Sequence, residues 1–90
     1  MLVKLFATYR QIAGCKSCRV EAPQDVLGLL RDFCDRWPEF RDQLLNEDGT
    51  DKSNDVVILV NGYHIGRLDG VATKLADTDV VAISPVIGGG

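Results

Sequence analysis

The stretch DVLGLLRDFCDRWP, residues 25–38, decides the fold of this chain. Its apolar residues recur at positions i, i+3, i+4, i+7, i+8 and i+11, which is the spacing of one face of an α-helix. They are Val26, Leu29, Leu30, Phe33, Cys34 and Trp37. Asp25 is a favourable helix N-cap, and Pro38 disfavours helical geometry at Trp37. The pattern predicts a helix of about three turns with one side packed on a sheet.

Apolar stretches on both sides of this helix predict the strands of the sheet. Residues 2–9 and 17–22 read as two strands joined by a turn at 13–16, so the chain is expected to open with a hairpin. Residues 56–60 are a β-branched run, followed by the turn dipeptide Asn61-Gly62 and a short strand at 63–65. Residues 80–84 form a last strand. The first and last strands are the most apolar and are therefore expected to be central neighbours.

The segment after Pro38 predicts a second, shorter helix. Proline is favourable at the first helical position, and Phe40, Leu44 and Leu45 can then anchor this helix over one end of the core. Residues 46–55 hold no apolar side chain and are expected to form a solvated loop. A single amphipathic helix must bury its stripe on one face of a sheet, so the order of elements predicts a two-layer α+β domain with a mixed sheet, the β-grasp arrangement.

Size and composition exclude several classes of function. Ninety residues, 46% hydrophobic and 26% charged, form one small domain without room for a deep catalytic cleft. The net charge of −3 argues against a nucleic-acid or membrane-surface partner. We find no stretch of about 20 apolar residues and no signal-peptide pattern. An odd number of cysteines, three, fits a reducing compartment, so a cytoplasmic location is expected.

The chain closes with Ile87-Gly88-Gly89-Gly90, a segment that cannot pack into a core. Glycine lets a backbone lie extended in a narrow channel and leaves the carbonyl of Gly90 open to attack by a nucleophile. We therefore expect residues 1–84 to form the folded domain and residues 85–90 a flexible tail whose exit is stiffened by Pro85. Six extended residues reach roughly 20 Å, far enough to enter a partner enzyme. The alternative is a frayed end without a function.

Several stretches taken together resemble the MoaD/ThiS group of ubiquitin-like sulfur carriers. They are VKLFA (3–7) with Arg10 and Gly14, VEAP (20–23), RWPEF (36–40), VNG (60–62) and DTDVVAISPV (77–86). Most of them are general features of the β-grasp fold. The specific signal is the last strand, which runs through a Pro-Val pair into terminal glycines.

The resemblance implies that the chain is a carrier subunit without catalytic groups of its own. A ubiquitin-activating-like adenylyltransferase, which uses ATP, would adenylate Gly90, and a sulfur donor such as a cysteine desulfurase system would convert the acyl-adenylate to a thiocarboxylate. The carrier itself would bind no cofactor and no metal. Residues 38–45 supply the second helix that shorter thiamin-pathway carriers usually lack. The resemblance therefore favours the small subunit of molybdopterin synthase, with its tail inserted into the large subunit.

One departure from the family pattern concerns the reactive end. The family commonly ends Pro-Val-x-Gly-Gly, whereas this chain has one more glycine after Ile87. Either Gly90 itself reacts, which we favour, or it is trimmed and Gly89 becomes terminal. Other functions stay open: a carrier for thiamin, amino-acid or tungsten-pterin biosynthesis, a ubiquitin-like modifier that forms isopeptide bonds with lysines, and a plain interaction domain.

A partner is expected to recognise the tail together with the sheet next to it. Apolar side chains on both faces of the first and last strands cannot all face one helix, so some should form an exposed apolar surface. The predicted partner-binding residues are Phe6, Ile83, Pro85, Val86, Ile87 and Gly88. The alternative is that the short second helix and the loops cover this surface.

Cys15 and Cys18 have the spacing of redox and zinc motifs. They fall in a predicted hairpin turn rather than at a helix N-terminus, where a redox pair would have a lowered pKa. Only Cys34 and His64 remain as further zinc ligands, and Cys34 lies on the stripe that faces the core. An incidental or structural role is therefore expected for the pair, with a surface disulfide as the main exception.

Overall fold

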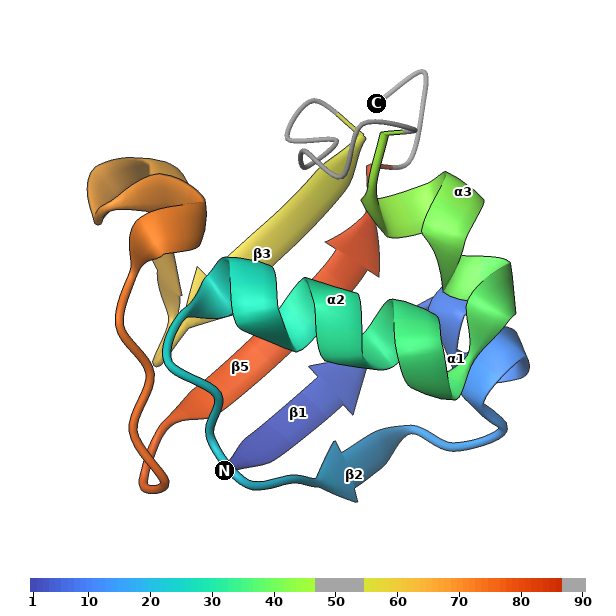
Figure 1. Ribbon diagram of the computed structural model, residues 1–90, viewed down its shortest axis with the longest axis horizontal. Coiled ribbons are helices and arrows are strands. Elements are labelled where there is room, and N and C mark those ends of the chain that lie inside the picture. The colour runs from blue at the N-terminus through green and yellow to red at the C-terminus, as the bar shows by residue number, and fades with distance from the viewer. Residues whose placement is uncertain (47–54, 87–90) are drawn as a thin grey trace.

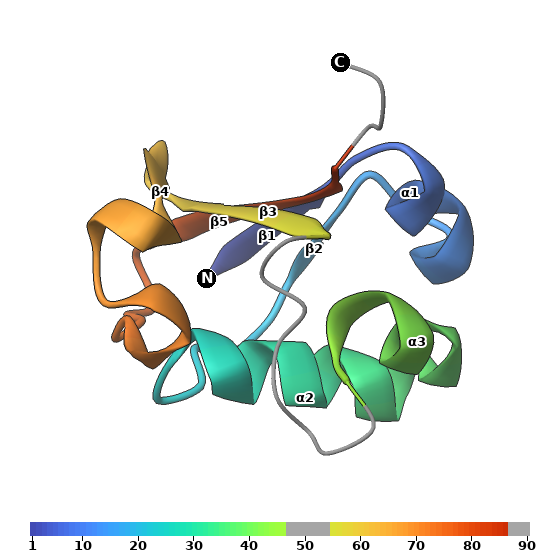
Figure 2. The same cartoon turned by 90° about the horizontal axis from the view of Figure 1, so that it is seen from above.

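The computed structural model describes residues 1–46 and 55–86, which form two layers, a sheet and a set of helices on one of its faces (Figures 1 and 2). In this part of the chain the strands lie in the order β2-β1-β5-β3-β4. Their bounds are β1 Leu2–Leu5, β2 Ser17–Arg19, β3 Val56–Val60, β4 Tyr63–His64 and β5 Val80–Pro85. Strand β5 runs parallel to β1 and antiparallel to β3. The prediction of a two-layer α+β domain with the first and last strands as neighbours is confirmed.

The main helix α2 spans Val26–Arg36 and begins as the sequence predicts. A carboxylate oxygen of Asp25 accepts a hydrogen bond of 2.9 Å from the backbone N–H of Gly28, which satisfies a donor in the first turn. The predicted second helix is present as a 3-10 turn, η1 Pro38–Phe40, followed by α3 Arg41–Leu44. Within the described residues, no helix is long and apolar enough to cross a membrane.

The predicted antiparallel pairing of the first two strands is confirmed, but the turn predicted to join them is wrong, because a helix separates them. Strand β1 stops at Leu5, and α1 occupies Thr8–Ala13. Ala7 has a φ of 52°, a conformation that L-residues rarely adopt, and it turns the chain out of the sheet. Gly14, with a φ of 73°, ends α1, and its N–H donates to the carbonyl of Arg10 at 2.8 Å. Strand β2 is also shorter than predicted.

The core lies between the two layers and contains an aromatic cluster at the end covered by α1 and η1. Tyr9 packs edge-on against Phe40, with 5.5 Å between ring centroids, and Phe33 lies 5.2 Å from Trp37 and 5.9 Å from Phe40. Such pairs stabilise beyond the area they bury. Because Tyr9 is buried at the α1 interface, α1 belongs to the core and not to a surface loop.

Burial raises the pKa of Tyr9 to about 12, and the nearby carboxylate of Asp55 adds to the effect. The folded state therefore keeps a proton that the unfolded state releases near pH 10, so the stabilisation is complete below pH 10 and is lost as pH rises toward 12. We expect the free energy of unfolding, measured with urea, to fall by roughly 2–3 kcal/mol over this pH range because of Tyr9. A Tyr9→Phe variant should not show this fall. If the free energy of unfolding decreased equally with pH in both proteins, Tyr9 would not be the group responsible.

The predicted Asn-Gly turn connects β3 and β4, and it is also tied to the start of β5. Asn61 and Gly62 have φ values of 52° and 86°. The amide of Asn61 donates to Asp79 at 2.9 Å, and its oxygen accepts from the backbone N–H of Val80 at 2.9 Å. These contacts fix where β5 enters the sheet and hence where it leaves it.

Candidate functional site

The C-terminal segment begins at the end of β5, the central strand of the sheet. Pro85 is the last residue of β5 and pairs with Val56 of β3. The backbone N–H of Val86 then donates to the carbonyl of Asp55 at 3.0 Å. Pairing thus continues past residue 84, where the sequence predicts the folded domain to end. The remaining predicted site residues, Ile87, Gly88, Gly89 and Gly90, lie outside the described residues.

Phe6 lies beside this exit. Because β1 is parallel to β5, the two strands end at the same edge, and the N–H of Phe6 donates to the carbonyl of Ile83 at 3.2 Å. The side chain of Phe6 is 37% exposed and that of Val86 is 50% exposed. Two of the predicted partner-binding residues are thus accessible at the end of the sheet from which the tail departs.

Arg10 holds Phe6 in place, a role that the sequence reasoning missed. Its guanidinium Nε donates to the carbonyl of Leu5 at 2.7 Å, and its Cζ lies 5.1 Å from the centre of the Phe6 ring. The missed signal is the helical spacing of Tyr9, Ile12 and Ala13, all of which pack on or in the core. Once α1 is recognised, Arg10 is seen to lie on this helix, close to the end of β1.

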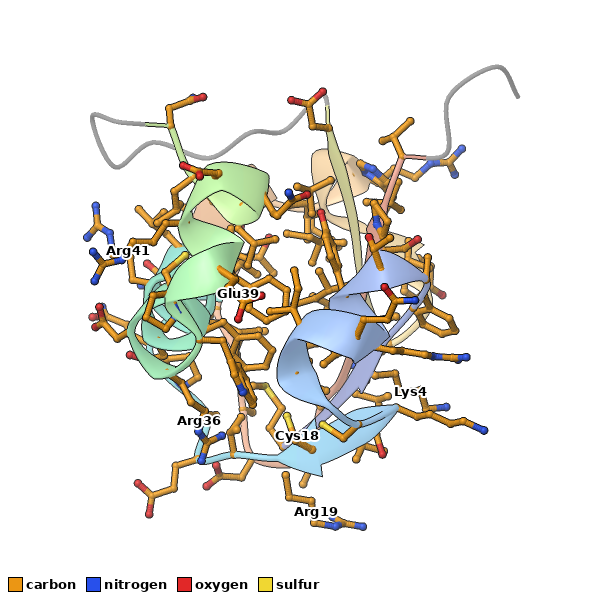
Figure 3. All side chains as sticks on the ribbon, turned by 90° about the vertical axis from the view of Figure 1, so that its right-hand side faces the viewer. Lys4, Cys18, Arg19, Arg36, Glu39 and Arg41 are labelled. Carbon is orange, nitrogen blue, oxygen red and sulfur yellow. The ribbon has the colours of Figure 1, made fainter. Side chains whose placement is uncertain are left out.

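The face of the sheet turned away from the helices, called the outer face below, is largely apolar. The helices bury one face of the sheet, which includes Val3, Leu5 and Val81 and, on β3, Val56, Ile58 and Val60. The alternate residues of each strand therefore point the other way. Lys4 shows this direction in Figure 3. The outer-face apolar residues of the strands are Leu2, Val57, Leu59, Val80 and Ala82. Neither α2 nor α3 covers this face (Figure 2).

Ile83 does not lie on the exposed surface where the sequence analysis places it. Its side chain is fully buried, with 0% exposure, because it alternates onto the helix side of β5 with Val81. A strand apolar on both faces does not reveal from sequence which face the helix covers. The assignment of the outer face instead favours Val80 and Ala82, the residues that alternate with Val81 and Ile83.

The three cysteines are free thiols, with Cys15 and Cys18 half-buried and Cys34 buried. Burial raises the pKa of the Cys18 thiol, the nearby Cys15 raises it further, and Arg36 opposes both. Burial likewise raises the pKa of Cys34. No group of three or more Cys, His, Asp or Glu residues that could hold a metal ion is found in residues 1–46 and 55–86. Cys15 and Cys18 both pack on the core.

Known proteins resemble this chain over nearly its whole length. Residues 3–90 match the model of the ThiS family. The small archaeal modifier protein 3 of Haloferax volcanii is 37% identical over 90 residues, covering 98% of this chain and 96% of the relative.

Solved structures show the same fold. The solution structure of the small archaeal modifier protein 1 from Methanosarcina acetivorans has a TM-score of 0.84 and 29% identity, covering 99% of this chain and 94% of its own. A putative molybdopterin converting factor, subunit 1, from Pyrococcus furiosus has a TM-score of 0.76 and 30% identity, covering 96% and 95%. The β-grasp prediction is confirmed by these neighbours.

Proposed function

Because the chain belongs to the ThiS family, we propose that it is a ubiquitin-like modifier whose Gly90 carboxylate is activated and then joined to lysine side chains of target proteins. The observation that carries this proposal is the match to a small archaeal modifier protein over almost the full length of both chains. We propose a cytoplasmic site of action, where ATP and target proteins are available.

The chemistry needs activation because a carboxylate is a poor electrophile. Attack of a Gly90 carboxylate oxygen on the α-phosphorus of ATP would release pyrophosphate and leave an acyl-adenylate. The amine of a lysine can then attack the carbonyl carbon, with loss of AMP and a proton, to form an isopeptide bond. In this proposal ATP is bound by the activating enzyme, and the chain contributes the reacting carboxylate and the surface that positions it.

The described part of the site supports recognition by such an enzyme. Phe6 follows β1 and Val86 follows β5, which are neighbouring parallel strands, so both exposed side chains lie at the same end of the sheet. The outer face continues the apolar surface from there. An adenylyltransferase that docks on this surface would find the tail beginning at its edge. Proline at position 85 restricts the backbone at this exit, which limits the directions in which the tail can leave.

Sulfur transfer is the second candidate, and the Pyrococcus furiosus neighbour favours it specifically for molybdopterin synthesis. In that case hydrosulfide released by a sulfur donor would attack the carbonyl carbon of the same acyl-adenylate and displace AMP, giving a thiocarboxylate and a proton. The chain would then act as the small subunit of molybdopterin synthase, with its tail in the large subunit. Carriers for thiamin, amino-acid or tungsten-pterin pathways would use the same terminus.

Two mass measurements distinguish these candidates, one of the purified chain and one of conjugates isolated from the native host. In the first, the chain is incubated with its native activating enzyme and ATP, with and without a sulfur donor, and its intact mass is measured. A mass in which sulfur replaces one oxygen at the terminus supports the carrier candidate. Conjugates in the native host that carry the Gly90 carbonyl on a lysine amine support the modifier. Absence of both products with an active enzyme would contradict the proposal.

Phe6 provides the test of the docking surface. We expect a Phe6→Ala variant to raise the KM of the activating enzyme roughly tenfold or more, because central exposed aromatics dominate interface energies. Leu68→Ala is the matched control, since Leu68 is a similarly exposed apolar residue, 41% against 37%, outside the outer face. Thermal melting of both variants checks the fold. Equal KM values for Phe6→Ala and Leu68→Ala would contradict docking at this surface.

A further inference from the structure

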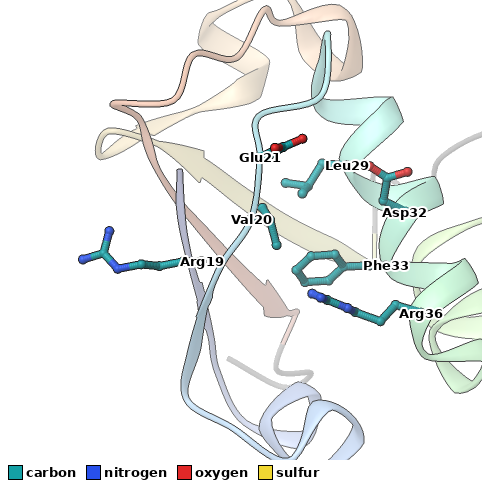
Figure 4. A pocket seen from close by; sticks show the side chains of 7 residues that line it. All are labelled: Arg19, Val20, Glu21, Leu29, Asp32, Phe33 and Arg36. Atoms are coloured by element: carbon teal, nitrogen blue, oxygen red, sulfur yellow. The ribbon is translucent and has the colours of Figure 1, made fainter.

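A groove lies between the edge strand β2 and helix α2, away from the exit of β5. The cavity has a volume of about 370 Å³. Its floor is apolar and consists of Val20, Leu29 and Phe33, while Glu21, Asp32 and Arg36 surround it (Figure 4). We call it the β2–α2 groove. Its floor can accept a bulky aliphatic side chain, and its charged surround can accept the neighbours of that side chain.

The main chain at the edge of this groove is available for pairing. Val20 exchanges hydrogen bonds with Met1, its N–H donating at 3.0 Å, and Leu5 donates to the carbonyl of Lys16 at 2.8 Å. Antiparallel pairing alternates, so the even-numbered residues of this stretch face β1, whereas the main-chain groups of Ser17 and Arg19 point to the free edge. Strand β2 ends the sheet in the described part of the chain.

The side chain of Arg19 leaves this edge clear. It points away from the groove in Figure 4 and away from the helices in Figure 3. Arg19 nonetheless lines the cavity, which places this part of strand β2 at the border of the cavity. An unpaired strand edge next to an apolar cavity is the arrangement that accepts an added strand, with backbone hydrogen bonds for affinity and a pocket for one side chain.

Charge determines which charged neighbour lies at each end of the cavity. Arg36 reaches over one end of the cavity beside Phe33, whereas Glu21 and Asp32 lie at the other end (Figure 4). Alternate residues of a strand lie on one face about 6.5–7 Å apart, so a central anchor has one neighbour on each side that faces the same way. The acidic neighbour belongs beside Arg36 and the basic one beside the two carboxylates.

We propose that the β2–α2 groove binds an extended segment of a partner protein that adds as a strand to β2, inserts one bulky aliphatic side chain over Val20, Leu29 and Phe33, and carries an acidic and a basic residue two positions to either side of it. This inference does not depend on the chemistry at Gly90. Leu2 pairs with both Arg19 and Val80, so the groove lies at the opposite end of β5 from Pro85. A bound partner would leave the tail accessible.

Two synthetic peptides test the proposal. Each has seven residues, threonine except at the second, fourth and sixth positions, which hold lysine, isoleucine and aspartate in one peptide and the reverse order in the other. The isotope-labelled full chain is titrated and its amide NMR shifts are followed. We expect one order to bind with a Kd below about 1 mM, about threefold to tenfold tighter than the other. The shifts should map to β2 and α2. No shifts with either peptide, or shifts confined to the outer face, would overturn the proposal.

Two pairs of variants separate strand addition from general surface binding. Arg19→Pro removes the outward N–H, whereas Arg19→Ala keeps it, and proline is tolerated at such an edge position. Arg19→Pro should bind about tenfold more weakly, and Arg19→Ala within about twofold of the original. Arg36→Glu should abolish the preference for one peptide order, whereas Arg31→Glu, the same change outside the groove on α2, should preserve it. Equal behaviour within either pair would overturn the proposal, and the Arg36 pair decides alone if Arg19→Pro does not fold.

Discussion

Deleting Gly90 is expected to lower acyl-adenylate formation by about 100-fold or more, because the reacting carboxylate would then lie one residue, about 3.5 Å, short of the activating enzyme's ATP. Addition of one alanine after Gly90 should lower the rate by a similar factor, because the carboxylate would then lie one residue too far along the tail. The measurement is ATP–pyrophosphate exchange with the native activating enzyme. In the described part of the chain the buried core extends no further than Ile83, so melting temperatures should stay within about 1–2 °C of the original.

The same pair of variants identifies the reactive glycine. If the native host trims Gly90, the chain that ends at Gly89 should be the faster substrate and the original should react only after trimming. An undiminished rate for both the shortened and the lengthened chain would contradict a role for the terminus. Unfolding of either variant would contradict the separation of the reactive end from the folded domain.

Phe33→Ala should cause a large loss of stability, because the side chain it truncates lies at the centre of the aromatic cluster. Phe33 is 1% exposed on the buried face of α2 and contacts the rings of both Trp37 and Phe40. Its removal leaves a cavity between the layers at a cost of roughly 3–5 kcal/mol. For a domain of this size, the melting temperature should fall by more than about 12 °C.

The control for this prediction is the exposed neighbour Arg31 on the same helix. Arg31→Ala keeps the helix propensity and removes no buried contact, so it should change the free energy of unfolding by less than about 0.5 kcal/mol. Urea unfolding followed by circular dichroism measures both. A Phe33→Ala chain that unfolds like the original would mean that α2 does not pack on the sheet as described.

The helix and the later strands could be predicted because each has one strong local signal. Asp25 caps α2, the apolar stripe is continuous to Trp37, and the Asn61-Gly62 turn fixes the hairpin that follows β3. The opening segment lacks such a signal. Residues 2–9 alternate well enough for a strand, yet Tyr9, Ile12 and Ala13 also satisfy a helical period over only six residues, and the turn depends on the unusual backbone of Ala7.

The sequence predicts only part of the surface of the candidate site, and the chemistry at its glycines stays a prediction. The glycines, Pro85, Val86 and Phe6 are recognisable from their residue types and positions, whereas the choice between Ile83 and its neighbours depends on which side of the sheet α2 covers. That choice is a property of the whole fold, because β5 is apolar on both faces. Arg10 could be placed beside Phe6 only after α1 was known.

The parallel pairing of Leu2 with Val80 and of Leu5 with Ile83 bears on how this protein is made. Strand β1 leaves the ribosome well before its neighbour β5, because every other element in the described part of the domain lies between them in the sequence. The sheet therefore stays split until translation has passed Pro85, and the slow, long-range closure of the chain comes afterwards. A chain that is terminated before β5 would lack a central strand of the sheet, so neither β1 nor β3 would have the neighbour that joins them.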